Sequence, residues 1–196
     1  MTLDYVLLGK AIKYYKSLGY KEVELPWTAS KEAIEATLPP QGLPISSDIG
    51  MLVGSAEQSF LDRIVMRQQE GGRFLGKYQA TTPCFRNEIE DSLHKKYFMK
   101  TELFNNETVT GEELQKMIAH ALNFFDSLNL DVDFMVDPTG DHMFDILEEQ
   151  TGIEVGSYGI RHHEKFGSWI YGTGIALPRL DSAIISSIRV TIERSK

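Results

Sequence analysis

Apolar residues recur every three or four positions near the start of the chain, a spacing typical of one face of a helix. The residues on this face are Leu3, Val6, Leu7, Leu8, Ala11, Tyr14, Tyr15 and Leu18. Gly19 is well placed to end that helix, because glycine readily adopts the left-handed conformation of a C-terminal cap. The next residues, KEVEL, alternate polar and apolar side chains. This alternation predicts a short strand that stops at Pro26.

Helical periodicity returns at several later places in the chain. The predicted helices cover Ser30–Thr37, as one or two turns, Glu57–Glu70, Glu112–Leu128 and Leu180–Glu193. The third is the clearest, because Thr110 and Glu113 have the spacing of a capping box at its start. The proline- and glycine-rich run LPPQGLPISS, Leu38 to Ser47, predicts a surface loop that could order over a ligand.

Strand-like patterns dominate the middle and the end of the chain. They are GRFLGKYQATTPCFRNEI, KYFMKTELF, LDVDFMV, HMFDILEE, IEVGSYGI and SWIYGTGI. Few predicted helices separate these runs, which favours an antiparallel β-sheet flanked by helices, an α+β fold. A chain of 196 residues is of the size of one domain, so we expect residues 1–196 to form a single domain.

The amino-acid composition indicates the class of protein and the compartment in which it is expected. Hydrophobic residues make up 42% and charged residues 24%, as in an ordinary globular protein, and no apolar run approaches the ~20 residues of a membrane span. The single cysteine, Cys84, cannot by itself form an intrachain disulfide or a cysteine-based zinc site, so a reducing cytoplasm is expected. The net charge of -8 argues against a broad nucleic-acid surface, although His94-Lys95-Lys96 forms a small basic cluster.

Candidate chemistry concentrates between Thr81 and Phe104. Because strand side chains alternate between faces, Arg86 and Glu88 share one face, and Phe98, Lys100 and Glu102 share one face of the return strand. An arginine fork, an aromatic ring and a carboxylate suit an anionic, planar ligand such as a nucleotide. Alternation alone is equally compatible with a solvated face that carries cross-strand ion pairs, which is the commoner situation.

Three further groups offer alternative interpretations. His162-His163-Glu164 contains metal-binding residue types, but adjacent strand histidines point to opposite faces, which favours a loop without a metal. Cys84 is expected to be a small buried residue rather than a nucleophile. Trp169 and Tyr171 alternate along a strand and are expected to pack in the core or to wall a pocket.

TPCFRNE followed by FMKTE resembles motif 2 of the class II aminoacyl-tRNA synthetases, a strand with arginine and glutamate, a loop and a return strand. LLGKAIKYYKSLGYKEVELP resembles motif 1, the helix and strand that build the dimer interface in that family. YGTGIALPRL resembles motif 3, a glycine-containing strand that leads to an arginine at a helix start. The resemblance runs from Leu3 to about Glu193 and implies the catalytic-domain fold of this family, with a homodimer through Leu3–Pro26.

The resemblance also implies how ATP would be held. Arg86 would hold the α-phosphate and stabilise charge in the transition state. Glu88 would contact the adenine amine, and Phe98 would stack under the ring. Arg179 would take the γ-phosphate from the other side.

For the metal and the amino acid, the resemblance implies a second set of residues. Glu154 would bind Mg²⁺ that bridges the phosphates, with Ser157 as a weaker ligand. Glu102 would receive the α-ammonium group, and Ser55-Ala56-Glu57 matches a loop that contacts the same group. Thr173 lies where the seryl enzymes sense the side-chain hydroxyl. No zinc site is expected, because the cysteine ligands of zinc-dependent relatives have no match.

The amino acid and its acceptor are less sharply indicated. GSAEQSF and GTGIALPR resemble the seryl enzymes, whereas FRNEIEDSLHKKYF and IEVGSYGIRHH resemble the phenylalanyl, pyrrolysyl and phosphoseryl branch. Serine or another small amino acid is favoured. We expect no helical tRNA-binding arm or anticodon domain within these residues, so the acceptor is a tRNA acceptor end, a carrier protein or a small molecule.

Three functional interpretations remain open from the sequence. The chain is a minimal adenylating enzyme, a synthetase-like paralogue that binds ATP or an amino acid in a regulatory role, or an interaction module within a larger assembly. The retained Arg86, Glu88, Phe98, Glu154 and Arg179 favour the first.

Overall fold

The computed structural model describes residues 3–39, 42–87, 89–91 and 95–194. Over these residues the chain forms a seven-stranded sheet in the order β1-β5-β6-β10-β9-β8-β7 and a three-stranded sheet in the order β2-β4-β3. The strands are β1 (Lys21–Glu22), β2 (Thr28–Ala29), β3 (Ile45–Ser47), β4 (Gly50–Leu52), β5 (Lys77–Phe85), β6 (Tyr97–Asn105), β7 (Phe134–Gly140), β8 (Met143–Glu148), β9 (Glu154–His163) and β10 (Gly167–Leu177). The larger sheet is antiparallel except for the β1–β5 pair, which is parallel. The predicted α+β class is confirmed.

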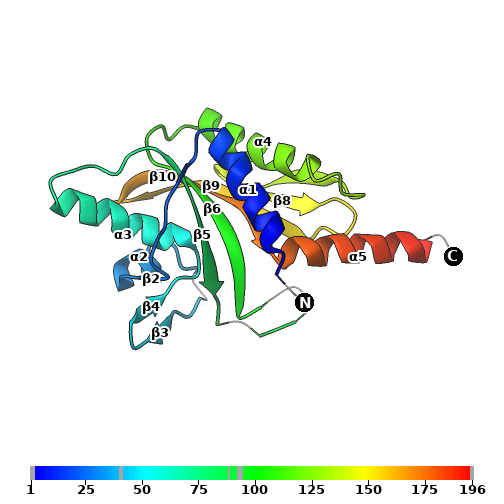
Figure 1. The fold of residues 1–196 in the computed structure, drawn as a ribbon, viewed down its shortest axis with the longest axis horizontal. Coiled ribbons are helices and arrows are strands. Elements are labelled where there is room, and N and C mark those ends of the chain that lie inside the picture. Colours follow the sequence, from blue (N-terminus) through cyan, green and yellow to red (C-terminus); the bar gives the residue numbers. More distant parts are fainter. Residues whose placement is uncertain (1–2, 40–41, 88, 92–94, 195–196) are drawn as a thin grey trace.

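Helices flank this sheet (Figure 1). They are α1 (Tyr5–Ser17), α2 (Lys31–Glu35), α3 (Ala56–Gln69), α4 (Gly111–Asp126) and α5 (Arg179–Arg194). Side chains at their starts satisfy backbone N–H groups that have no partner inside the helix. Asp4 accepts from Leu7 N at 2.9 Å before α1, and Thr110 accepts from Glu113 N at 3.2 Å before α4. Ser55 and Gln58 form a reciprocal capping box at the start of α3.

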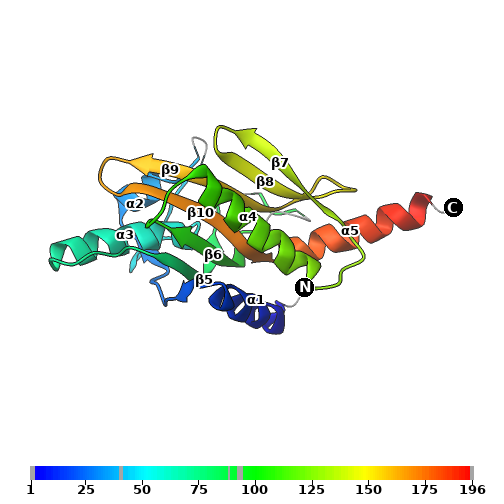
Figure 2. The ribbon, with the colours of Figure 1, turned by 90° about the horizontal axis from the view of Figure 1, so that it is seen from above.

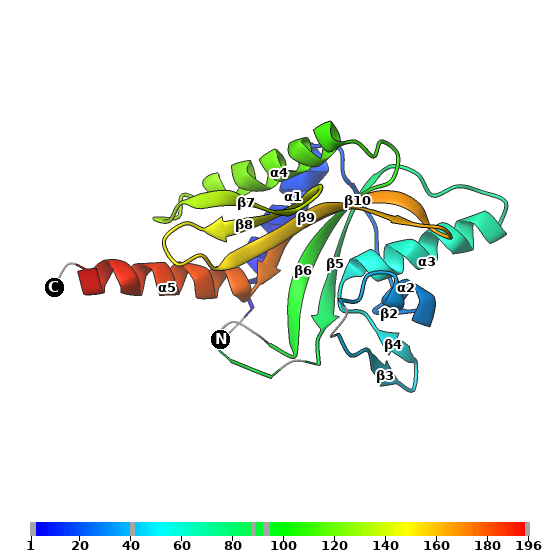
Figure 3. The same cartoon turned by 180° about the vertical axis from the view of Figure 1, so that it is seen from behind.

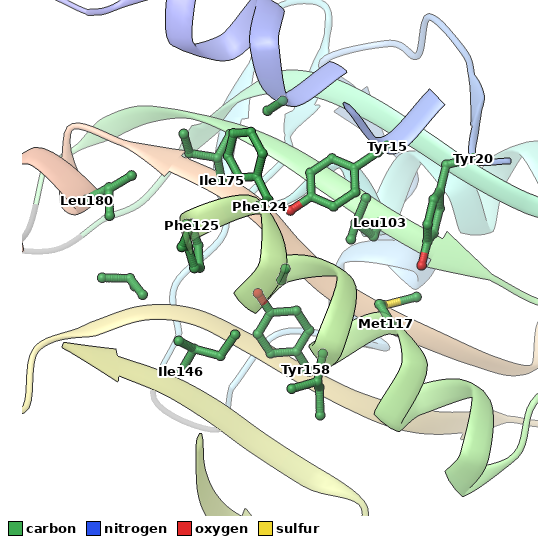
Figure 4. Packing of buried hydrophobic residues seen from close by; sticks show 14 of the residues in the cluster. Tyr15, Tyr20, Leu103, Met117, Phe124, Phe125, Ile146, Tyr158, Ile175 and Leu180 are labelled. Carbon is green, nitrogen blue, oxygen red and sulfur yellow. The ribbon is translucent and has the colours of Figure 1, made fainter. Parts of the chain in front are cut away.

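Helices α1 and α4 lie across one face of the larger sheet, and α5 extends past its edge (Figure 2). The buried core between these helices and the sheet contains Tyr15 from α1, Phe124 from α4 and Tyr158 from β9 (Figure 4). The rings of Tyr15 and Phe124 are 5.6 Å apart, and the Tyr15 hydroxyl donates to the carbonyl of Gly174 at 2.8 Å. This face of the sheet is therefore filled by core packing.

The opposite face is covered only in part. Helices α2 and α3 and the small sheet pack over one end of it, around Phe60, Phe104 and Trp169. No described helix crosses the part of β6, β9 and β10 that lies between α3 and α5 (Figure 3). This uncovered part of the sheet holds most of the residues that the sequence predicts for a ligand site.

Three local features of the structure differ from the sequence predictions. The sequence predicts Val6 on the buried face of its helix, but its side chain is 71% exposed because it lies on the side of α1 away from the core, which Leu7 and Leu8 contact. The strand predicted at KEVEL pairs over Lys21–Glu22 alone. The predicted loop Leu38–Ser47 contains a strand at Ile45–Ser47, since β3 pairs with β4 in a hairpin.

We predict that Gly172→Ala destabilises the fold by about 1–3 kcal/mol, the usual effect of overpacking a core. A Cβ atom at this position on β10 would lie 2.6 Å from Met117 Sδ of α4 and 2.6 Å from a ring carbon of Tyr158. The free energy of unfolding in urea measures the effect.

Gly9→Ala is the matched control, because a Cβ at this position in α1 meets no atom within 4 Å. It should stabilise the protein by about 0.5–1 kcal/mol, since alanine loses less backbone entropy in a helix. Unchanged stability of the Gly172 variant would contradict the described contact between α4 and β10.

Candidate nucleotide and amino-acid site

A cavity of about 230 Å³ opens on the uncovered face, between the end of β5, the strands β6, β9 and β10, and the start of α5. The described residues that line it are Arg86, Lys95, Phe98, Lys100, Glu154, Val155, Ser157, Thr173, Ala176, Pro178 and Arg179. Four of these described residues are cationic and one is acidic, although the chain as a whole carries a formal charge of -8. The local balance of charge suits an anionic ligand.

Arg86 follows β5 and enters the cavity beside Phe98. Its Nε donates to the carbonyl of Gly54 at 3.3 Å, and its guanidinium carbon lies 5.7 Å from the centre of the Phe98 ring. Phe98 is opposite Cys84 in the β5–β6 register. The hairpin therefore brings an arginine fork and an aromatic ring to one end of the cavity, as predicted from their shared face.

Arg179 lies on the other side of the same cavity, at the first position of α5. Its Nη1 is 3.4 Å from Glu154 Oε2 and 3.5 Å from the Glu154 carbonyl oxygen. Arg86 and Arg179 come from distant parts of the sequence, yet both line one cavity. This arrangement is compatible with two guanidinium groups that contact one polyanion from two sides.

The side chains of Glu154, Ser157 and Asp145 bring oxygen atoms near Arg179. Asp145 of β8 is opposite Ser157 of β9 in the strand register, and Thr173 Oγ1 accepts from Ser157 N at 3.3 Å. Burial raises the pKa of Asp145, while a hydrogen bond with Ser157 opposes this effect. Among the described residues, no group of three acidic, histidine or cysteine side chains could hold a metal by itself. One or two carboxylates still fit Mg²⁺, because this ion is commonly shared with phosphate oxygens and water.

A second cavity of about 530 Å³ adjoins the first and shares Arg86, Lys100, Glu154 and Ser157 with it. Ser55 and Glu57 line this second cavity, and it extends under Leu38 and Leu43. The run predicted as a loop over a ligand thus contributes to its wall. The two cavities form adjoining compartments on the scale of a few hundred Å³ that is usual for small-molecule sites.

Glu57 is buried and already has two partners. Its carboxylate accepts from Trp169 Nε1 at 2.6 Å and from Arg161 Nη1 at 2.8 Å. Burial raises the pKa of Glu57, and the Arg161 guanidinium partly offsets that rise. Arg161 in turn stacks over the Tyr171 ring, 4.3 Å from its centre. Glu57 thereby fixes one wall of the second cavity, a role that the sequence did not indicate.

Glu102 lies on β6, opposite Thr173 of β10. Its Oε2 accepts from the Ser55 hydroxyl and lies 2.5 Å from Lys100 Nζ. Its Oε1 is buried and has no hydrogen-bond partner among the described residues. The structure therefore brings Ser55 and Thr173 next to Glu102, while their predicted roles toward an amino acid stay predictions.

Some predicted positions fall elsewhere. Glu88 and His94 lie outside the described residues, so their predicted roles stay predictions. The loop predicted at His162-His163 is wrong, because both residues end β9. His162 Nδ1 lies 2.9 Å from Ser168 Oγ, across the β9–β10 hairpin. Cys84 is buried, as predicted.

Sequence reasoning missed two charged side chains of the site, and it placed a third, Lys100, on the shared face without a role. Arg161 and Asp145 carry no local signal, since Arg161 acquires its partner Glu57 from helix α3 and Asp145 lies opposite Ser157 of strand β9. Lys100 does have a signal, because it stands two residues from Phe98 and from Glu102 and so shares their face.

No protein-family model matches this sequence, and no curated protein matches it. Solved structures do match. A cytoplasmic serine-tRNA ligase from Naegleria fowleri, in complex with AMP, superposes with a TM-score of 0.71 at 17% identity over 90% of this chain and 46% of that chain. A seryl-tRNA synthetase from Pyrococcus horikoshii, complexed with ATP, gives 0.69 at 18% identity over 91% of this chain and 49% of that chain.

A pyrrolysyl-tRNA synthetase from Desulfitobacterium hafniense, PylSc, gives a TM-score of 0.68 at 18% identity over 89% of this chain and 66% of that chain. The chain thus has the catalytic-core fold of the class II aminoacyl-tRNA synthetases, as its three motifs predict. It spans about half the length of the seryl enzymes that it matches. Within the described residues, no helix has the length and apolar character needed to cross a bilayer.

We predict that Cys84 does not react as a nucleophile in the folded protein. Its side chain is fully buried, and burial raises its pKa to about 11. At pH 8 only about one thiol in a thousand would then be ionised. Reaction with dithiobis(nitrobenzoate) should be very slow in the native protein and rapid in denaturant.

Ser46→Cys is the matched control, since Ser46 is exposed on β3. One thiol of this variant should react within seconds to minutes, and Cys84 should stay protected. Equal rates for the two thiols would contradict the burial of Cys84.

Proposed function

We propose that the protein activates an amino acid with ATP, forming an aminoacyl-adenylate and releasing pyrophosphate. The observation that carries the proposal is the placement of Arg86 and Arg179 in one cavity. The second cavity beside it is lined by Ser55 and Lys100, which both contact the buried carboxylate of Glu102. The similar structures with AMP and ATP support a nucleotide in this fold.

In the proposed complex, ATP occupies the first cavity. Arg86 binds the α-phosphate, Phe98 stacks on the adenine ring, and Arg179 binds the γ-phosphate. Glu88, outside the described residues, accepts from the adenine amine. The proximity of Arg86 and Phe98, and the cationic lining of the cavity, support these roles.

Mg²⁺ would be held by Glu154 and Ser157, with Asp145 as an added oxygen ligand. The ion would supply positive charge to the phosphate oxygens. Arg179 already contacts Glu154, so the same helix start would hold a phosphate and orient the carboxylate. Oxygen ligands alone suit Mg²⁺, and the proposal includes no zinc.

The amino acid would lie in the second cavity, with its α-ammonium on Glu102. Ser55 and Glu57, which line this cavity, would belong to the same subsite, and Thr173, which lines the first cavity, would sense a side-chain hydroxyl. Ser55 binds Glu102 directly, whereas Glu57 is occupied by Arg161, so Glu57 shapes the wall more than it binds the amine. Serine or another small amino acid is favoured, although a cavity of about 530 Å³ has room for larger side chains.

The reaction requires little covalent catalysis by the protein. A carboxylate oxygen of the amino acid bonds to the α-phosphorus, and the bond from that phosphorus to the pyrophosphate oxygen breaks with its electron pair. The substrate carboxylate is already ionised, so no general base is required. Positioning and charge stabilisation are expected to supply most of the rate, which suits a site built around Arg86 and Arg179.

The acceptor of the activated amino acid is a tRNA acceptor end, a carrier protein or a small molecule. We propose in addition that residues 1–196 act as one catalytic domain in the cytoplasm. The remaining hypotheses, a paralogue that binds ATP without turnover and a subunit with neither activity, become outcomes of the test below.

We predict amino-acid-dependent exchange of pyrophosphate into ATP for one member of a panel of all standard amino acids. Arg86→Ala should lower this exchange by about 100-fold or more, the loss typical of removing one stabilising donor at a transition state. Its free energy of unfolding should change by less than about 1 kcal/mol, as expected at a partly exposed position.

Arg63→Ala is the matched control, because Arg63 is exposed on α3 away from both cavities. It should keep full exchange. ATP binding without exchange would favour the regulatory hypothesis, and absence of both would favour a subunit role. A large stability loss in Arg86→Ala would instead support a structural ion-pair role for this face.

We also predict a homodimer through Leu3–Pro26, so that sedimentation gives twice the chain mass of 22.2 kDa. Tyr5 and Val6 are 68% and 71% exposed on α1, which leaves apolar area for a partner. Val6→Asp should shift the protein to a monomer. Leu75→Asp, at an exposed apolar residue outside this region, should leave the dimer intact.

A further inference from the structure

The first cavity opens where two neighbouring strands separate. The register of β10 with β9 runs from Gly167 to Gly172, whereas its register with β6 continues to Leu177. The start of β9, residues 154–157, pairs with β8 on its other side. Side chains from residues 154–157 of β9 and residues 173–177 of β10 line the first cavity. The separation of β9 from β10 therefore makes room for a ligand.

Two buried tyrosine hydroxyls bond to β10 where it leaves β9. Tyr158 of β9 donates to the carbonyl of Thr173 at 2.5 Å, and Tyr15 of α1 donates to the carbonyl of Gly174 at 2.8 Å. Both rings are fully buried in the core (Figure 4). Burial raises the pKa of both hydroxyls, so both stay protonated and remain donors. Two consecutive carbonyl groups of β10 are thus each bonded to a tyrosine from another element.

Three glycines make room for the two rings. A Cβ atom at Gly174 would lie 2.7 Å from a ring carbon of Tyr15, and one at Gly156 would lie 2.8 Å from the hydroxyl oxygen of Tyr158. A Cβ at Gly172 would lie 2.6 Å from a ring carbon of Tyr158. Glycine within a strand often marks such a close approach of another group to the backbone. The backbone of β9 and β10 is therefore fitted closely to both tyrosines.

The two bonded carbonyls belong to the irregular part of β10. Its pairing with β6 shifts between Thr173 and Ile175, so that Gly174 is left out of the register. Regular pairing would place Ile175 opposite Lys100 and turn its side chain toward the cavity, because strand side chains alternate between faces. The rest of β10, and with it the start of α5, would then move by one position. Groups that hold the shift therefore hold the end of β10 in place.

We infer that Tyr15 and Tyr158 are positioning residues for ATP in the first cavity. Their hydroxyls hold the shifted pairing of β10, and thereby place Arg179, at the start of α5, where it contacts the γ-phosphate. The inference rests on the proposed function, to which it adds two residues that touch no ligand. Arg86 and Phe98 depend less on these hydroxyls, because the register of β5 with β6 is unbroken along the whole of β5.

The experiment compares nucleotides that differ only in the β- and γ-phosphates. Calorimetry measures the binding of ATP and of AMP in the presence of Mg²⁺. Wild-type protein should prefer ATP, because Arg179 contacts a phosphate that AMP lacks. Tyr15→Phe and Tyr158→Phe each keep the ring and remove the hydroxyl. Each should weaken ATP binding by about threefold or more, the effect of one hydrogen bond, and leave AMP binding nearly unchanged.

Tyr20→Phe is the matched control. The Tyr20 ring is buried in the same core, 5.9 Å from the Tyr15 ring, but its hydroxyl lies 3.4 Å from His120 Nδ1 of α4. This variant should keep the wild-type preference for ATP. The loss in Tyr15→Phe should also depend on Arg179. In an Arg179→Ala background, Tyr15→Phe should cause no further loss of ATP binding, since residues that act through one another are not additive.

Equal weakening of ATP and AMP, or a loss that adds to that of Arg179→Ala, would overturn the inference, since the hydroxyls would then serve only the core. If one tyrosine variant does not fold, the other tests the same segment from another element. Failure of both to fold, or wild-type protein without a preference for ATP, would overturn the inference too.

Pyrophosphate exchange separates the inference from the proposed function. A preference for ATP that both tyrosine variants lose, in a protein whose wild type shows no exchange, would refute adenylation alone. Exchange by the wild type, together with an unchanged preference for ATP in both variants, would refute the positioning role alone.

Discussion

The register of β6 between β5 and β10 determines which side chains face the cavities and which face the core. Glu102 stands opposite Ala80 and Thr173, and Lys100 stands opposite Thr82 and Ala176. Because side chains alternate, the residues between them face the helices α1 and α4. A slip of one residue would move the polar set into the core and expose the apolar set. Burial of one face thus fixes the position of the charged groups on the other.

An irregularity in β10 adjusts this register at the site. The pairing of β10 with β6 shifts between Thr173 and Ile175, so that Gly174 is passed over. The carbonyl of Gly174 bonds to the Tyr15 hydroxyl on the core side. Thr173 and Ala176 can then both face the cavities, while Ile175 stays in the core. Strand irregularities often re-aim side chains next to functional sites in this manner.

Much of the arrangement of strands and helices could be predicted from the sequence, because the patterns that indicate it are local. Alternation in KYFMKTELF placed Phe98, Lys100 and Glu102 on one face, and helix α4 was found from its cap and periodicity. The partners of Glu57 could not be found in this way. Arg161 and Trp169 are 104 and 112 residues away in the sequence, and only the pairing of β9 with β10 brings them to α3. The extent of β1 and the hairpin of β3 likewise depend on pairing with distant strands.

The charged side chains around the cavities suit a polyanion, although the protein as a whole is acidic. Glu57 is matched by Arg161 and Glu102 by Lys100, so the compartment proposed for the amino acid is nearly neutral. Cationic excess remains around Arg86 and Arg179, in the compartment proposed for phosphate. Screening limits the reach of surface charge to about 8 Å at physiological ionic strength. The overall charge of -8 therefore acts weakly inside the cavity, where the nearby guanidinium groups dominate the local field.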